Sequence, residues 1–163
     1  MDNVIDQSGI LAISTRLQRL ADALRKEGQL IYQSFGIAFE PKWFAVVYTL
    51  HLKTSMSVVE IANEIGYAHP STISLLKELE KQQIIKSKKD KTDERKRLIV
   101  LTPKGKALVS AMQPVWDNMQ KALSQIADNK NNLMDAIIEA EEKLKVSGFL
   151  ERSQKIRLSG DVR

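Results

Sequence analysis

Apolar residues return at helical spacing along most of this chain. Between residues 10 and 35 they form a seam with steps of three and four positions: Ile10, Ile13, Leu17, Leu20 and Leu24. A seam this narrow predicts a long helix that packs against other helices. Gly36 would end this helix, because glycine readily adopts the left-handed conformation of a C′ residue.

The middle of the chain predicts two short helices joined by a turn. An almost wholly apolar helix over residues 41–52, which begins with a proline, precedes them. Ser57 and Glu60 then form a capping box for a helix that Gly66 ends. The next helix covers residues 70–82, and its buried stripe is Thr72, Leu75, Leu76 and Leu79. Two short helices around a glycine-containing turn are typical of a helix-turn-helix.

A hairpin and two long helices complete the pattern. Residues 84–88 and 98–101 predict two short strands around a polar segment. Thr102, followed by proline, is typical of a helix start, so we expect a long helix there with a bend at Pro114. A last helix is expected over residues 133–158. This order predicts a mainly α fold with a small β-wing, a winged helix-turn-helix.

The charge of the chain is concentrated in the predicted hairpin. The formal net charge is +5, and residues 86–97 hold seven basic side chains against three acidic ones. A basic β-ribbon suits the phosphate backbone of DNA, and an arginine can enter the narrow, electronegative minor groove. A solvated surface loop is the alternative interpretation. The position of the segment directly after a helix-turn-helix favours DNA.

Composition excludes several classes of protein. The chain has 163 residues, 43% of them hydrophobic, and no cysteine, so a folded core is expected and disulfides, zinc fingers and thiol sensors are not. Two histidines on different elements argue against a metal site. No enzyme motif is present, and we expect no catalytic residues and no cofactor. Neither a signal peptide nor an apolar run of membrane-helix length is visible, which predicts a cytoplasmic protein without membrane contact.

The second helix of the pair is the expected reader of DNA. Hydroxyl and basic side chains can contact phosphates or base edges, and a helix start offers free N–H groups to phosphates. The predicted DNA-contacting residues here are His69, Ser71, Thr72, Ile73, Ser74 and Lys77. Ile73 has two interpretations, contact with a thymine methyl group or packing under the wing. Lys81 fits an ordinary surface lysine as well as a DNA contact.

Three stretches of the sequence carry a resemblance to a known family. They are Ile61-Ala62-Asn63-Glu64-Ile65-Gly66 with His69-Pro70-Ser71-Thr72 and Leu79-Glu80-Lys81, then Asp90-Lys91-Thr92-Asp93-Glu94-Arg95, and finally Leu101-Thr102-Pro103-Lys104-Gly105. The chain resembles the multiple-antibiotic-resistance regulator (MarR) family in these motifs and in its order of elements. It departs from the family at the reading helix, where members often have a hydroxyl or basic residue at the position of Ile73 and an arginine near Ser74.

The resemblance implies roles for the wing. Arg95 would enter the minor groove, and Asp93 would orient the wing arginine. The predicted wing contacts to DNA are Lys88, Lys89, Asp93, Arg95, Lys96 and Arg97. The implied domains are an N-terminal dimerisation helix at 1–38, a DNA-binding domain at 39–104 and C-terminal dimerisation helices at 105–163.

A homodimer is the expected assembly. The helices over 10–35 and 133–158 cannot both bury their apolar seams on a winged module of this size, and a symmetric partner would supply the missing surface. The resemblance implies that the first and last helices of the two chains intertwine. The predicted interface residues are Ile10, Ile13, Leu17, Leu20, Ile137, Leu144 and Phe149.

A cluster of aromatic residues near a helix junction suggests an effector pocket. The resemblance implies control by a small molecule, and a small aromatic or phenolic compound would suit such a lining. The candidate residues are Tyr32, Phe39, Trp43, Tyr48 and His51. Ordinary core packing explains the same residues, and a neutral core histidine is the simplest interpretation of His51.

These observations and the family resemblance together predict a sequence-specific regulator that binds a pseudo-palindromic operator as a homodimer and is released by a small ligand. A repressor is favoured over an activator. The alternative is a winged-helix module that binds another protein. The basic hairpin separates the two, since a module that had lost DNA binding would have no use for it.

Overall fold

The computed structural model describes residues 3–89 and 97–160 of the chain. Contacts divide the chain into two compact units, Met1–Asp117 and Asn118–Arg163. The elements in chain order are α1 (Val4–Gln7), the 3-10 turn η1 (Gly9–Ala12), α2 (Ile13–Ser34), the 3-10 turn η2 (Pro41–Trp43), α3 (Phe44–Lys53), β1 (Ser55–Ser57), α4 (Val58–Ile65), α5 (His69–Lys81), β2 (Ile85–Lys89), β3 (Arg97–Leu101), α6 (Pro103–Ala127), α7 (Leu133–Val146) and α8 (Phe149–Ser159). None of the described helices is long and apolar enough to cross a membrane.

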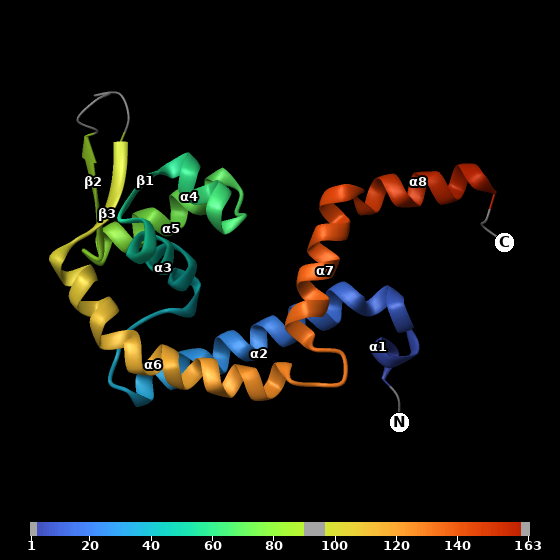
Figure 1. Cartoon of the computed structure of the whole chain (residues 1–163), viewed down its shortest axis with the longest axis horizontal. Coiled ribbons are helices and arrows are strands. Elements are labelled where there is room, and N and C mark those ends of the chain that lie inside the picture. Colours follow the sequence, from blue (N-terminus) through green and yellow to red (C-terminus); the bar gives the residue numbers. More distant parts are fainter. Residues whose placement is uncertain (1–2, 90–96, 161–163) are drawn as a thin grey trace. The chain divides into compact units, whose positions relative to one another are not determined.

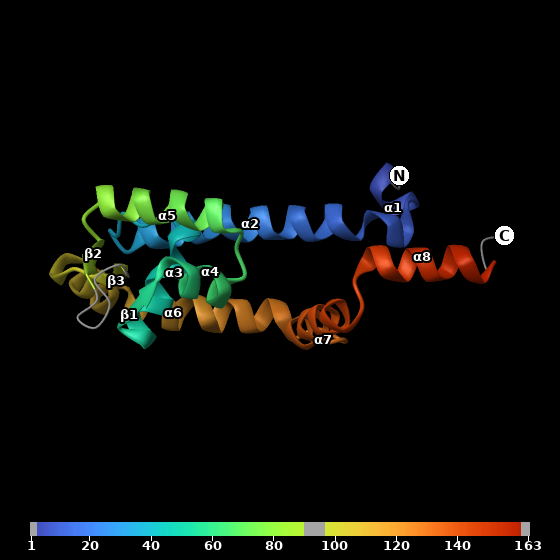
Figure 2. The same cartoon turned by 90° about the horizontal axis from the view of Figure 1, so that it is seen from above.

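The first long helix agrees with its prediction. Helix α2 is continuous, as Figure 2 shows, and a 3-10 turn precedes it. The chain leaves it at Phe35 and then adopts a φ of 70° at Gly36, as the C′ position of a helix favours.

The helix-turn-helix is made by α4 and α5. The Ser57 hydroxyl accepts a hydrogen bond from the backbone N–H of Glu60, and the Glu60 carboxylate accepts one from the N–H of Ser57, which confirms the capping box. Gly66 ends α4 in the left-handed conformation with a φ of 68°. The stripe of α5 is buried as predicted, at Thr72, Leu75, Leu76 and Leu79.

A three-stranded antiparallel sheet lies beside α3, α4 and α5 (Figure 1). The strand order is β1-β3-β2, and β2 pairs with β3 from Ile85 opposite Leu101 to Lys89 opposite Arg97. Strand β1 was not expected from the sequence, because three residues are too few for an alternating pattern to show. The core of this part of the chain contains Val46 and Val47 of α3, which are wholly inaccessible to solvent, together with residues of α4, α5 and α6.

One threonine joins the end of α5 to the start of α6. The Thr102 hydroxyl donates to the carbonyl oxygen of Gln83 at 2.6 Å and accepts the backbone N–H of Gly105 at 3.0 Å, as an N-cap residue does. The backbone N–H of Thr102 also donates to the carbonyl oxygen of Ile84 at 3.0 Å. These bonds hold the turn after α5, where Gln83 has a φ of 59°, against the exit from the sheet.

The same junction leaves no room for a side chain at Gly105. A Cβ atom placed on Gly105 would lie 2.1 Å from the carbonyl oxygen of Ile84, which belongs to the backbone and cannot rotate away. The Lys104 ammonium group adds a bond to the carbonyl oxygen of Gln82 at 2.8 Å, at the end of α5. The motif Leu101 to Gly105 is therefore a structural joint between three elements.

The second unit contains the end of α6 and the helices α7 and α8. The prediction of one helix over 133–158 is wrong, because Ser147 adopts an extended conformation and Gly148 caps the next helix. The chain changes direction between α7 and α8 (Figure 1). Arg152 spans the break by donating to the carbonyl oxygens of Ser147 and Lys143, each at 2.8 Å. Helix α6 runs unbroken through Pro114, and the bend there stays a prediction.

We expect Gly105→Ala to lower the free energy of unfolding by about 1–3 kcal/mol, the usual cost of overpacking a closed site. The measurement is urea denaturation followed by circular dichroism. Lys106→Ala is the matched control, because it places the same residue at the next, exposed position of α6 and should change the free energy by less than about 0.5 kcal/mol. Equal stability of Gly105→Ala and Lys106→Ala would contradict the close contact.

Candidate nucleic-acid interface

Helix α5 presents a polar face to solvent. Its N-terminus has no side-chain cap, so the backbone N–H groups of His69 and Ser71 remain available to a phosphate, while Pro70 between them has none. His69, Ser71, Ser74 and Lys77 are exposed. The period of the helix places Ser74 and Lys77 near the middle of the face opposite the buried stripe, and it places the half-buried Ile73 on one flank.

Thr72 does not belong to this face, and the prediction that its side chain contacts DNA is wrong. The residue is 0% exposed, and its hydroxyl donates to the carbonyl oxygen of Ala68 at 3.2 Å. Thr72 lies three positions before Leu75 and four before Leu76, so it shares their side of the helix. Its hydroxyl is thereby satisfied inside the core.

Two carboxylates hold the flanks of α5. On one flank, the Glu80 carboxylate accepts the backbone N–H of Ser87 in β2 at 3.1 Å. On the other flank, the Glu78 carboxylate accepts the indole N–H of Trp43 at 3.1 Å and pairs with the Lys42 ammonium group at 2.7 Å. Neither contact was predicted from the sequence, since neither glutamate lies on the predicted buried stripe.

The contacts of Glu78 change its acid–base behaviour. The hydrogen bond from Lys42, and after it the bond from Trp43, lower the pKa of Glu78 below its ordinary value. In turn the hydrogen bond to Glu78, then that to Glu40, raises the pKa of Lys42. Both groups therefore stay charged at neutral pH, and their partially exposed ion pair links α5 to η2.

The described ends of the hairpin are basic. Lys88 and Lys89 of β2 are exposed, and Arg97 of β3 is exposed opposite Lys89. Three cations therefore lie at the point where the two strands lead into the segment between them. The predicted wing residues Asp93, Arg95 and Lys96 lie outside the described residues, and their roles stay predictions.

Three of the predicted pocket residues pack as a buried column, here called the aromatic column. The ring centroids of Tyr32 and Phe39 are 4.9 Å apart, and those of Phe39 and Trp43 are 5.7 Å apart. All three residues are at most 6% exposed. The Tyr32 hydroxyl accepts the indole N–H of Trp116 in α6 at 2.9 Å, and burial raises the pKa of Tyr32.

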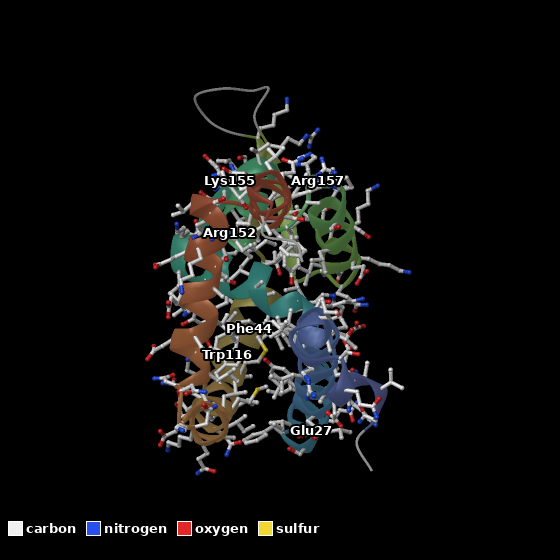
Figure 3. All side chains as sticks on the ribbon, turned by 90° about the vertical axis from the view of Figure 1, so that its right-hand side faces the viewer. Glu27, Phe44, Trp116, Arg152, Lys155 and Arg157 are labelled. Carbon is white, nitrogen blue, oxygen red and sulfur yellow. The ribbon has the colours of Figure 1, made fainter. Side chains whose placement is uncertain are left out.

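The other two predicted pocket residues lie at the surface in a second aromatic group. Tyr48 is 38% exposed and His51 is also exposed, which excludes the interpretation of His51 as a core histidine. Both rings lie near Trp116, with centroids at 5.3 and 6.5 Å. Phe44 stacks on Tyr48 at 5.1 Å, and Figure 3 shows Phe44 beside Trp116. Phe44 and Trp116 were not predicted as pocket residues, because they lie far apart in the sequence, in α3 and α6.

Two surface hollows lie away from these aromatic residues. One of about 460 Å³ is lined by Glu80, Gln83, Ile85, Lys86, Thr102, Pro103 and Lys104. A second of about 470 Å³ is lined by Lys53, Ser55, Met56, Glu60, Asn63 and Glu64. Neither contains a predicted effector residue, so the effector pocket remains a prediction.

The predicted dimer residues carry apolar surface in the single chain. Ile10, Ile13, Leu144 and Phe149 are more than half exposed, and Leu17 is 48% exposed. Leu20 and Ile137 are partially buried. Apolar surface of this extent marks an interaction site, which agrees with the prediction of a partner without identifying it.

A family model covers the winged segment. Residues 40–96 match the model of the MarR family, which confirms the resemblance seen in the sequence. No curated protein sequence matches the chain.

Solved structures share the fold along most of the chain. MepR in the S. aureus MepR–DNA complex is 21% identical in sequence to this chain, with a TM-score of 0.66. The match covers 80% of this chain and 96% of the MepR chain. A mutant MarR from E. coli complexed with operator DNA is 14% identical, with coverages of 88% and 99% and a TM-score of 0.63. Bordetella bronchiseptica BpsR, whose DNA binding is regulated by 6-hydroxynicotinic acid, is 20% identical, with coverages of 80% and 98% and a TM-score of 0.57. These similarities confirm the predicted fold class.

The buried phenol of Tyr32 predicts that the protein becomes less stable at high pH. The pKa of Tyr32 is raised above 10.0 in the folded state, so the unfolded state loses this proton first as the pH rises. The contribution of the neutral phenol to the free energy of unfolding is therefore fully present below pH 10 and is lost as the pH rises through the folded pKa. Tyr32→Phe removes the titration and the acceptor for Trp116. We expect it to unfold more easily than the wild type by about 1–3 kcal/mol at neutral pH, the cost of an unsatisfied buried donor.

That difference should shrink when urea denaturation is repeated at pH values above 10. Tyr48→Phe is the control, because it removes a hydroxyl from the exposed aromatic group and not from the column. A difference between wild type and Tyr32→Phe that is constant with pH would contradict the titration of Tyr32.

Proposed function

We propose that this chain, a member of the MarR family through its residues 40–96, is a transcriptional regulator that binds double-stranded DNA with sequence specificity. The observation that carries the proposal is the pairing of an outward polar face on α5 with a basic hairpin directly after it. A winged helix places such a helix in the major groove and uses the hairpin on the flanking backbone.

On α5 the contacts to base edges are assigned to Ser74 and Lys77. Both are exposed at the middle of the outward face, and their hydroxyl and ammonium groups can bond to base edges or phosphates. His69 and Ser71 lie at the helix start, where the uncapped N–H groups suit a phosphate. Ile73, half-buried on the flank that also carries Glu80, has less access to DNA than these four.

The hairpin supplies the contacts to the phosphate backbone and the minor groove. Lys88, Lys89 and Arg97 are exposed where its strands end, and they would neutralise phosphates on either side of the groove. Arg95 is assigned to the minor groove and Asp93 to its orientation, on the strength of the family resemblance alone.

The chain acts as a homodimer on a pseudo-palindrome in this proposal. The exposed apolar residues of η1, α2, α7 and α8 support a second copy as the partner, with dimerisation segments at 1–38 and 105–163 and a DNA-binding segment at 39–104. Two-fold symmetry then requires inverted half-sites, about one helical turn or ~34 Å apart. Binding at a promoter would make the protein a repressor by excluding the transcription machinery.

A small aromatic effector is the remaining part of the proposal. BpsR, which shares the fold, is regulated by 6-hydroxynicotinic acid. In this chain the exposed rings of Phe44, Tyr48 and His51, which lie near the buried Trp116, offer ring faces to such a compound. The buried aromatic column of Tyr32, Phe39 and Trp43 is core.

The DNA proposal predicts binding that is steeply salt-dependent. We expect the wild-type protein to select a palindromic sequence from a random pool of double-stranded DNA, and to lose affinity for a labelled copy as salt rises, in fluorescence anisotropy. Arg95→Ala and Lys77→Ala should each weaken binding, and the loss of a phosphate contact should reduce the slope of log K against log salt by about 1. Neither change should unfold the protein.

Lys26→Ala is the control, because it removes the same charge from an exposed position of α2. Its binding should equal that of the wild type. If no DNA is selected, or if affinity is flat with salt, the chain is instead a winged-helix module for a protein partner.

The dimer proposal predicts that charge on the α2 seam separates the two chains. Leu17→Glu combined with Leu20→Glu should give a monomer in sedimentation velocity, since two carboxylates would be buried without partners in the interface. Gln29→Glu combined with Gln33→Glu adds the same charge at exposed polar positions of α2 and should leave a dimer. A dimer in the leucine variant would place the interface elsewhere.

A further inference from the structure

The two flanks of α5 are attached to different parts of the molecule. Glu80 binds a backbone N–H of β2, so it joins α5 to the wing that follows it. Glu78 binds Trp43 and Lys42 of η2, so it joins α5 to the segment that links α2 with α3. Only the second attachment leads from α5 toward the long helix α2.

The bond to Trp43 matters more than the ion pair. Lys42 and Glu78 are 46% and 41% exposed as side chains, and an ion pair of that exposure contributes little. Trp43 is 6% exposed, and its indole N–H has the Glu78 carboxylate as its acceptor. A buried donor left without an acceptor costs more than an exposed pair gains. The orientation of α5 is therefore tied to the position of the Trp43 ring.

The Trp43 ring is in turn held by the aromatic column. Phe39 contacts Trp43 edge to face, Tyr32 of α2 packs on Phe39, and Trp116 of α6 donates to the Tyr32 hydroxyl. A continuous series of contacts therefore runs from α2 and α6 to the outer flank of α5. All of its members except the Glu78 carboxylate are buried.

Apolar packing alone would leave α5 some freedom. The buried stripe of α5 is held by contacts that have little directional preference, whereas a hydrogen bond weakens steeply when its angle changes. The bond between Glu78 and Trp43 is the directional contact on the α2 side. Its loss would allow α5 to rotate or shift on its apolar stripe.

We infer that Glu78 is a positioning residue, which fixes the orientation of α5 relative to α2 through Trp43 and so sets the spacing of half-sites that the homodimer accepts. The inference rests on the proposed function. In a two-fold dimer held by α2, each α5 must enter its groove at a set distance and angle. One added base pair moves the second half-site by about a tenth of a helical turn, which a rigidly held α5 cannot follow.

The test measures spacing preference and not affinity alone. The selected palindrome is compared with versions whose spacer is one base pair shorter or longer, by anisotropy at one salt concentration. Four variants are used: Glu78→Leu, Glu78→Gln, Trp43→Phe and the double variant Glu78→Leu with Trp43→Phe. Glu64→Leu is the matched control, because Glu64 forms an ion pair with Lys53 at 2.8 Å and is also 41% exposed.

We expect Glu78→Leu to reduce the preference for the native spacing by roughly fivefold, the size of a typical coupling between contacting residues. Trp43→Phe keeps an aromatic ring beside Phe39 and removes the N–H donor together with part of the indole, so it should also reduce the spacing preference. The double variant should be no worse than either single one. Glu78→Gln should restore the preference, because its amide oxygen can accept the indole N–H, and Glu64→Leu should behave as the wild type.

Two results would overturn the inference while the proposed function stands. In one, Glu78→Leu keeps the spacing preference of Glu64→Leu. In the other, Glu78→Leu weakens binding to all three spacings equally, with a lower melting temperature, which would indicate a structural role only. If Glu78→Leu does not fold, the spacing preferences of Trp43→Phe and Glu78→Gln test the inference in its place. It then requires a reduced preference in Trp43→Phe and a wild-type preference in Glu78→Gln. If the wild type selects no double-stranded DNA, the proposed function fails and this inference fails with it.

Discussion

The winged segment is assembled around the contact between the backbone of Gly105 and the carbonyl group of Ile84. Three elements meet there, since Ile84 lies between α5 and β2 and Gly105 lies in the first turn of α6. The hydrogen bonds of Thr102 to the same turn add direction to a contact that is otherwise only close packing. A side chain at this point would push α6 away from α5, and both the hairpin and the reading helix would lose their common support.

Helix α6 also contacts the aromatic column, through Trp116. Trp116 of α6 bonds to Tyr32 of α2, and the column of Tyr32, Phe39 and Trp43 reaches α5 through Glu78. The helix that is expected to read DNA is thus held at its end by Thr102 and Gly105, on one flank by β2 and on the other by η2. Its outward face, with Ser74 and Lys77, has its direction set by these attachments and not by its own sequence.

Local features of the fold were predictable from the sequence, and contacts between distant residues were not. The capping box of Ser57 and Glu60, the left-handed Gly66 and the buried stripe of α5 depend on neighbours within a few positions, and all were confirmed. The break at Ser147 was missed because the apolar spacing continues across it, although the following glycine was a signal for it. Strand β1 is too short to show a pattern.

The candidate site shows the same division. The basic hairpin was visible as a run of charge, but Thr72 was assigned to the DNA face when its place in the buried stripe already indicated the core. The bond between Glu78 and Trp43 joins residues 35 positions apart, and that between Trp116 and Tyr32 joins residues 84 apart. No local spacing reports such pairs, and a half-buried glutamate on a helix looks like ordinary surface in sequence.

Hydroxyl-radical footprinting of the wild-type protein on its selected DNA maps contacts to the sugar–phosphate backbone without assuming any residue's role, and it therefore shows whether a dimer reads two half-sites. A homodimer that reads DNA with α5 and the hairpin should give two protected regions related by two-fold symmetry, with centres about one helical turn apart and with flanking protection across the minor groove from each hairpin. Absence of protection, or a single asymmetric region, would contradict a homodimer that reads DNA with α5 and the hairpin.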